Sequence, residues 1–129
     1  MASIFTRIIQ GEIPCHKVAE NDRFLAFLDI SPLREGHTLV VPKLEVDRFF
    51  DLPVDLMAEI MPFAQEVAIR IRQAVPCDRV GVAVIGLEVP HAHVHLIPID
   101  RMADMDFTRD KLKLTQAELA AIAERIRTA

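Results

Sequence analysis

Short apolar stretches separated by polar turns predict five β-strands. Several of these stretches are rich in β-branched residues, and RVGVAVI and HAHVHLIPI are the most typical of strands. The pair Asn21-Asp22 lies between the first two stretches and favours a tight hairpin turn. We therefore predict strands at residues 16–20, 23–30, 37–43, 79–85 and 91–99.

A helical period runs through the middle of the chain. From Val54 to Ala74 the apolar residues recur every three or four positions, whereas most charged residues avoid that stripe. This pattern predicts a long helix that lies with one face on a sheet. Pro62 falls inside it, and because proline lacks an N–H and its ring clashes with the preceding turn, it should kink or divide the helix. We expect a bend near residues 59–61.

Three shorter helical segments are also indicated. The sequence IFTRII at residues 4–9 is typical of a short helix or turn, and residues 46–53 are typical of a short helical link. Thr115 is well placed to cap a final helix, with Glu118 three residues later as its capping-box partner. The helices thus flank the strands rather than alternate with each of them.

The order of these elements indicates one small α+β domain that spans residues 1–129. The five-residue link GLEVP, at residues 86–90, is too short for a parallel crossover and favours antiparallel pairing of the last two strands. We therefore expect a five-stranded antiparallel sheet with the long helix on one face and a helix at the C-terminus.

Charge and hydropathy argue against two classes of binding partner, nucleic acids and membranes. The net charge of −4 and the lack of a basic run argue against a nucleic-acid surface. No apolar run approaches the roughly 18 residues that cross a bilayer, and the first residues show no secretory pattern. We expect a cytoplasmic protein that binds neither nucleic acid nor membrane, with Cys15 and Cys77 as free thiols.

The run HAHVH places three of the five histidines of the chain at alternating positions. Because successive side chains of a strand point to opposite faces, His91, His93 and His95 are predicted to share one face. Ala92 and Val94 then point the other way, toward the long helix. One face of this strand is expected to be packed and the other to carry chemistry.

Three interpretations of the histidines are open from the residues alone. They could be exposed strand residues without a role, or ligands of an open catalytic zinc site. They could also act on phosphorus, since a neutral imidazole nitrogen can attack an electrophilic phosphorus and form a phosphohistidine. Neighbouring imidazoles would then orient the nucleophile and bind phosphoryl oxygens.

The residues around the run resemble a known family. The motif His-x-His-x-His followed by two apolar residues is the signature of the histidine triad, or HIT, family, and residues 91–97 meet it in full. The resemblance extends from about residue 4 to residue 100 and is greatest to the small Hint-type branch. Three further stretches are similar to nucleotide-pocket segments of that family: residues 4–14, 23–33 and 36–43.

The resemblance implies a role for each of four histidines. His93 would be the nucleophile toward the α-phosphorus of a nucleotide, and His95 would bind or protonate a phosphoryl oxygen. His91 would support the orientation of the nucleophile. His37, in the sequence GHTLVV, matches the position of a fourth histidine that hydrogen-bonds the nucleophile.

The resemblance also implies a nucleotide pocket. Asp29 corresponds to the carboxylate that accepts hydrogen bonds from the ribose diol. Glu88 and Val89 belong to the turn whose backbone N–H groups are left to hold the phosphate. The base slot would be formed by apolar residues that the pattern alone would assign to the core: Ile4, Phe5, Ile8, Phe27, Ile30 and Leu39.

The chain departs from the family at two places. Metal-binding members carry a Cys-x-x-Cys pair and a later histidine where this chain has Ser3, Thr6 and Glu45, so no zinc site is expected there. Many members also carry Asn and Gly-Gln before the triad, where this chain has Leu87 and Glu88. The second departure bears on the choice of leaving group and on the rate.

The hypothesis is a Hint-like nucleotide hydrolase or nucleotidyl transferase that needs no metal or cofactor. It would cleave the α-phosphate bond of a purine nucleoside 5′-phosphoramidate or a related conjugate through a nucleotidyl intermediate on His93. The family resemblance further implies an edge-to-edge homodimer. Two alternatives remain, a nucleotide-binding regulatory module with little turnover and a metal-dependent enzyme that uses the histidines as ligands.

Overall fold

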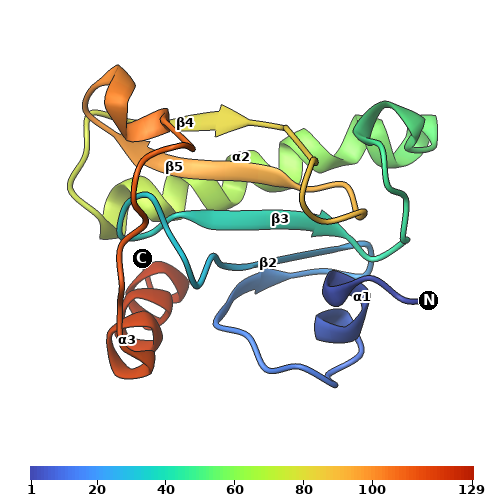
Figure 1. Ribbon diagram of the computed structural model, residues 1–129, viewed down its shortest axis with the longest axis horizontal. Coiled ribbons are helices and arrows are strands. Elements are labelled where there is room, and N and C mark those ends of the chain that lie inside the picture. Colours follow the sequence, from blue (N-terminus) through green and yellow to red (C-terminus); the bar gives the residue numbers. More distant parts are fainter.

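The computed structural model describes residues 1–129 and has the predicted α+β architecture. Five antiparallel strands form one sheet in the order β1-β2-β3-β5-β4, with helices on both of its faces (Figure 1). The elements are α1 (Ile4–Ile9), β1 (Lys17–Glu20), β2 (Phe24–Leu28), β3 (Thr38–Pro42), η1 (Phe49–Asp51), α2 (Val54–Ala74), β4 (Arg79–Ala83), β5 (Val94–Ile99), η2 (Met102–Met105) and α3 (Gln116–Arg127).

The last strand starts later than predicted. β5 begins at Val94 rather than at His91, because the preceding backbone bonds outside the sheet. The N–H of His91 donates to the carbonyl of Val89 at 2.8 Å. The N–H of Ala92 donates to the carbonyl of Val46 at 2.7 Å. The other four strands lie within their predicted ranges, and the antiparallel pairing of β4 with β5 is confirmed.

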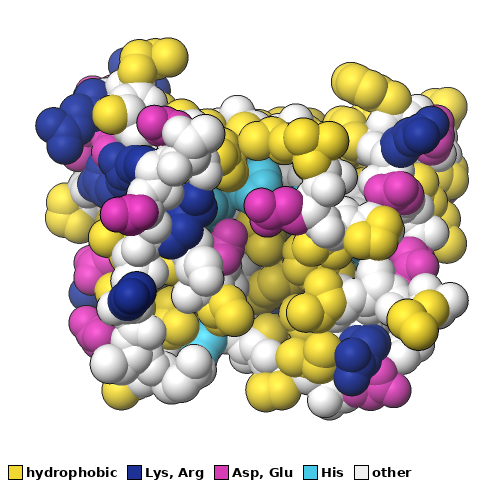
Figure 2. Space-filling model, viewed as in Figure 1, with side chains coloured by type: hydrophobic (Ala, Val, Ile, Leu, Met, Phe, Trp, Pro, Cys, Tyr) yellow, Lys and Arg dark blue, Asp and Glu magenta, His cyan; other side chains and the backbone are white.

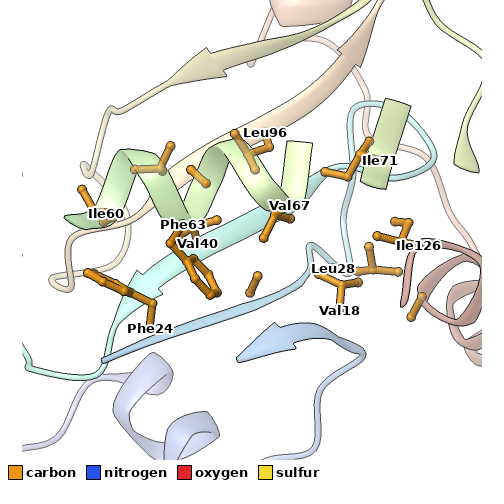
Figure 3. Packing of buried hydrophobic residues seen from close by; sticks show 14 of the residues in the cluster. Val18, Phe24, Leu28, Val40, Ile60, Phe63, Val67, Ile71, Leu96 and Ile126 are labelled. Atoms are coloured by element: carbon orange, nitrogen blue, oxygen red, sulfur yellow. The ribbon is translucent and has the colours of Figure 1, made fainter. Parts of the chain in front are cut away.

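The main core lies between the sheet and the two long helices. α2 and α3 cover one face of the sheet, and inward-pointing strand residues such as Val40 and Leu96 meet Phe63 and Val67 of α2 (Figure 3). Burial of this apolar surface supplies most of the free energy that holds the layers together. On the opposite face a smaller cluster lies under α1: Phe5, Leu25, Phe27, Leu39 and Val41.

The helices follow the predicted pattern with one difference. α2 runs unbroken from Val54 to Ala74, so the predicted possibility of a division at Pro62 is wrong. Pro62 is exposed, and on that side water can bond the carbonyl that the missing N–H leaves free. Thr115 and Glu118 form the predicted capping box of α3. No helix combines the length and the apolar character needed to cross a membrane.

Candidate active site

A cavity of about 670 Å³ opens on the face of the sheet that carries α1. Its lining comes from α1, from β2 and β3 with the loop between them, from the loop after β4, from the histidine run and from the segment before α3. Figure 2 shows a hollow with histidine side chains at its bottom and hydrophobic side chains along its wall. Small-molecule pockets commonly measure roughly 300–1,000 Å³, so a nucleotide-sized ligand fits this volume.

Most of the residues that the resemblance assigns to the site line this cavity. His37, His93 and His95 do so, whereas His91 lies behind the cavity wall. The fold also brings to the cavity the predicted substrate-binding residues Ile4, Phe5, Ile8, Phe27, Asp29, Ile30, Leu39, Glu88 and Val89. Segments from four parts of the chain therefore converge on one site.

His91 is fully buried and is held from both sides. Its Nε2 lies 2.8 Å from the carbonyl oxygen of Pro42, and its Nδ1 lies 2.7 Å from Oγ of Ser3. A carbonyl oxygen can only accept, so Nε2 carries the proton and the Ser3 hydroxyl donates to Nδ1. Burial lowers the pKa of His91, which favours this neutral form. His91 is thus an anchor and does not face the ligand.

His93 is oriented by the backbone of its neighbour. Its Nδ1 lies 2.7 Å from the carbonyl oxygen of His91, so Nδ1 carries the proton and donates. The lone pair is then left on Nε2, the nitrogen remote from this bond. Phe5 packs edge-on against the ring with the two centroids 5.1 Å apart. The arrangement fixes the tautomer that a nucleophilic imidazole requires.

His37 and His95 form a directed pair. The backbone N–H of Leu33 donates to Nδ1 of His37 at 3.0 Å, so the proton of His37 is on Nε2. That nitrogen lies 3.0 Å from Nδ1 of His95, which therefore accepts. The proton of His95 is then on Nε2, where it is available as a donor. The expectation that His37 hydrogen-bonds the nucleophile His93 is wrong, because its partner is His95.

Burial keeps this pair neutral. Removal of the rings from water lowers the pKa of His37 to about 3 and that of His95 to about 4. Charge on one neighbouring histidine opposes charge on the next, which lowers both values further. At neutral pH the chain of donors from Leu33 to His95 is therefore intact, and His95 can donate a hydrogen bond but carries no positive charge.

Asp29 closes the turn after β2 and also faces the cavity. Its Oδ1 accepts from the N–H of Ser31 at 2.9 Å, and its Oδ2 lies 3.7 Å from Nε2 of His37. Burial raises the pKa of the Asp29 carboxyl, and the hydrogen bond from Ser31 opposes that effect. Asp29 therefore serves as a turn residue while one carboxylate oxygen is left for a ligand.

A hydrogen-bonded network replaces metal ligands near α1. Oε1 of Glu45 accepts from the N–H of Ser3 at 2.7 Å and from the hydroxyl of Thr6 at 2.6 Å. Ser3 in turn caps α1 and bonds His91. These side chains fix the start of α1 and the loop before η1 to the ring of His91. The sequence indicated only that they lack the ligands for zinc, and their structural role follows from the fold.

The geometry does not favour the three histidines of the run as metal ligands. His91 uses one ring nitrogen on Pro42 and the other on Ser3. The ligand-type groups that do converge, within 4.8 Å of one another, are those of Asp29, His37 and His95. Both nitrogens of His37 are already hydrogen-bonded, so a metal ion here would have to displace the bonds that orient His95.

Sequence reasoning gave no role to several residues that line the cavity, among them Phe107 and Lys111. Phe107 packs edge-on against His95, with the ring centroids 4.8 Å apart, and Lys111 lines the cavity beside it. Both belong to the segment between η2 and α3, which has no periodic pattern and lies outside the stretches of resemblance. Only the course of the chain after β5 brings them to the site.

The geometry agrees with a comparison of the whole sequence with known families. Residues 10–102, most of the chain, match the HIT domain family. The chain belongs to this family. The predicted family assignment is therefore confirmed, and the run at residues 91–95 is its histidine triad.

Relatives and solved structures of other HIT proteins agree with this assignment. A HIT-like protein of Helicobacter pylori is 40% identical over 103 residues, which cover 77% of this chain and 98% of the relative. Adenosine 5′-monophosphoramidase HNT1 of Saccharomyces cerevisiae is 38% identical over 102 residues, covering 75% of this chain and 62% of the yeast protein. A HIT-like protein of Bartonella henselae has a TM-score of 0.85 at 28% identity and covers 98% of this chain and 94% of its own.

Proposed function

We propose that this HIT protein is a nucleotide hydrolase or nucleotidyl transferase acting on purine nucleoside 5′-phosphoramidates or related conjugates. The observation that carries the proposal is the assignment of tautomers. A free lone pair on Nε2 of His93 and an N–H on Nε2 of His95 belong to the same cavity. A yeast relative named as a phosphoramidase supports the choice of substrate class.

In the first step the lone pair of His93 Nε2 forms a bond to the α-phosphorus, and the bond from phosphorus to the leaving amine breaks. The amine departs with a proton taken from solvent at the open side of the cavity. The His91 carbonyl holds the Nδ1 proton of His93 and so accommodates the positive charge that the ring acquires. His95 donates its Nε2 proton as a hydrogen bond to a phosphoryl oxygen.

In the second step water attacks the same phosphorus. Its proton goes to solvent, the electrons of the phosphorus–nitrogen bond return to Nε2 of His93, and the nucleoside 5′-monophosphate leaves. An alcohol or amine in place of water would give nucleotidyl transfer. Asp29 would hold the ribose and the apolar residues of α1, β2 and β3 would enclose the base, as the family resemblance implies.

Hydrolysis of adenosine 5′-phosphoramidate by the wild type and by His93→Ala tests the proposal. We expect the wild type to release ammonia and AMP and the variant to lose this activity. Mass spectrometry of the acid-quenched wild type should show an adenylyl adduct on His93. Equal rates in the two proteins would rule out the mechanism, and guanosine 5′-phosphoramidate as a second substrate reports the base preference.

The same assay separates the two alternatives. A metal-dependent enzyme would lose activity on dialysis against a chelator, whereas the histidine mechanism predicts full activity. A regulatory module would bind AMP without hydrolysing the phosphoramidate. Leu87 and Glu88 are the reason to consider a regulatory module. With these residues the turn before the triad offers no neutral polar side chain to the phosphate.

We further propose that two copies pair through β4. This strand ends the sheet, so its outer edge has no strand partner. Val82 and Val84 are exposed on alternate positions, and Ile85 beside them is also half exposed. Light scattering should give the mass of a dimer for the wild type and of a monomer for Val82→Lys. A monomeric wild type at micromolar concentration would contradict this pairing.

A further inference from the structure

The segment that leads from η2 to α3 forms one wall of the cavity. It is fixed to the loop after β2 by backbone and side-chain bonds. The N–H of Leu112 donates to the carbonyl of Pro32 at 2.8 Å, and the guanidinium of Arg109 donates to the carbonyl of Leu33 at 2.6 Å. The residues of this wall therefore have defined positions relative to the histidines.

Lys111 is held in this wall by uncharged partners. Its ammonium donates to the carbonyl of Phe107 at 2.6 Å and to the carbonyl of Arg109 at 3.1 Å. An ammonium has three N–H donors, so one is left over. Lys111 takes part in none of the ion pairs of the protein. The side chain is thus fixed by the backbone and forms no ion pair, although the carboxylates of Asp29 and Glu88 line the same cavity.

Lys111 is also the only lysine or arginine among the residues that line the cavity. The buried histidines His37 and His95 are neutral near pH 7, so they donate or accept hydrogen bonds without positive charge. A phosphoryl group brings at least one negative charge into a mostly apolar pocket. Such a charge is costly to bury unless it is paired.

The charge of Lys111 acts at the centre of the site. Burial raises the pKa of Asp29 and lowers that of His37, and the charge of Lys111 acts on both groups as well. Lys111 lines the same cavity as Asp29, His37 and His95. In Figure 2 basic side chains border the hollow on the side where the chain descends to α3.

We infer that Lys111 binds a nonbridging oxygen of the α-phosphoryl group and supplies the positive charge that the neutral histidines lack. The inference rests on the proposed function in that a nucleotide occupies the cavity. It assigns specificity for the phosphate to a residue beyond the matched HIT region, which ends at residue 102. It also accounts for the absence of neutral polar side chains in the turn before the triad.

Calorimetric titration with AMP and with adenosine tests the inference without turnover. Lys111→Met keeps an unbranched stem of four heavy atoms and removes the charged nitrogen at its end. We expect it to weaken AMP binding by about tenfold or more, the usual scale for a charge-assisted hydrogen bond, and to leave adenosine binding within about twofold. Lys113→Met is the matched control, because Lys113 is exposed and does not line the cavity.

A purely structural role for Lys111 predicts a different result. Loss of the two carbonyl bonds would then weaken AMP and adenosine equally, which would overturn the inference. Lys111→Arg guards against a variant that fails to fold, since it keeps the charge and should retain the preference of the wild type for AMP over adenosine. An arginine variant that folds but binds both ligands alike would also contradict the assignment.

The outcome is separable from that of the proposed function. If the wild type prefers AMP through Lys111 but does not hydrolyse adenosine 5′-phosphoramidate, the proposed function fails and the anion site stands. If the wild type hydrolyses the substrate while Lys111→Met binds AMP as well as the wild type does, the proposed function stands and the role of Lys111 is refuted.

Discussion

The two faces of the segment that carries the triad obey different physical rules. On one face Ala92, Val94 and Leu96 are buried in the main core against α2. Their contacts are apolar and have no preferred direction, so residues of similar volume can replace them. On the other face each histidine has a defined partner for at least one ring nitrogen. Burial is similar on both faces, so hydrogen-bond direction and not burial separates the chemical face from the packed one.

The largest expected difference between the faces is in activity. His93→Ala should lower kcat by about a thousandfold or more, because it removes the proposed nucleophile. Its free energy of unfolding should change by only about 1 kcal/mol, since no other side chain hydrogen-bonds this ring. Phosphoramidate hydrolysis and urea denaturation measure the two effects. A variant that loses stability and activity in proportion would remove the contrast between the faces.

A substitution on the packed face should lower the free energy of unfolding rather than the activity. Leu96→Ala leaves a cavity among fully buried neighbours and should cost about 2–5 kcal/mol of unfolding free energy. The folded fraction should keep kcat/KM within about threefold of the wild type, because the hydrogen bonds of the histidines are untouched. Denaturation curves with activity normalised to folded protein check both numbers. A large loss of kcat in the folded fraction would mean that packing on this face sets the geometry of the other.

The hydrogen bonds that anchor His91 should give an intermediate result. Ser3→Ala removes the donor to Nδ1 of buried His91 and should destabilise the protein by about 1–3 kcal/mol. The rate should fall only a few-fold, because the His91 carbonyl still orients His93. Thr6→Val is the control, since its hydroxyl donates to Glu45 at 2.6 Å and lies 3.4 Å from Nδ1 of His91, against 2.7 Å for Ser3. Equal losses in the two variants would show that the bond to His91 has no special weight.

The smallest effect, counted per pH unit, is the change of the unfolding free energy with pH. The folded pKa values of His37 and His95, about 3 and about 4, lie below the ordinary value of 6.5. Between about pH 4 and 6.5 the unfolded chain therefore binds more protons than the folded one, so the free energy of unfolding falls as the pH falls. Each such proton contributes at most about 1.4 kcal/mol per pH unit.

His37→Asn provides the comparison for that prediction. Its side-chain oxygen can still accept from the N–H of Leu33, while the titrating ring is gone. Thermal unfolding followed from pH 7 to pH 4 should show a shallower dependence in the variant than in the wild type. Parallel curves would indicate that His37 is protonated in the folded protein and that the donor chain to His95 is not fixed.

Local pattern and the triad motif accounted for much of the architecture and for the location of the site. Alternation in residues 91–96 correctly separated the core face from the histidine face, and the period through α2 matched its observed bounds. The predicted hydrogen-bond partner of His37 was wrong. Strand register and the position of the Leu33 N–H, rather than sequence spacing, decide which histidine ring His37 contacts. A division of the helix at Pro62 was the wrong alternative, because the effect of a proline depends on which side of the helix faces solvent.

The sequence by itself determined the strands, the long helix and the set of histidines, since these depend on periodicities of neighbouring residues. The tertiary structure alone decided which nitrogen of each ring is free, that Ser3 and Glu45 anchor His91, and that Lys111 reaches the cavity. Ser3 and His91 are 88 positions apart, and His37 and His95 are 58. Contacts at such separations are set by how whole elements pack, so a local sequence pattern cannot predict them.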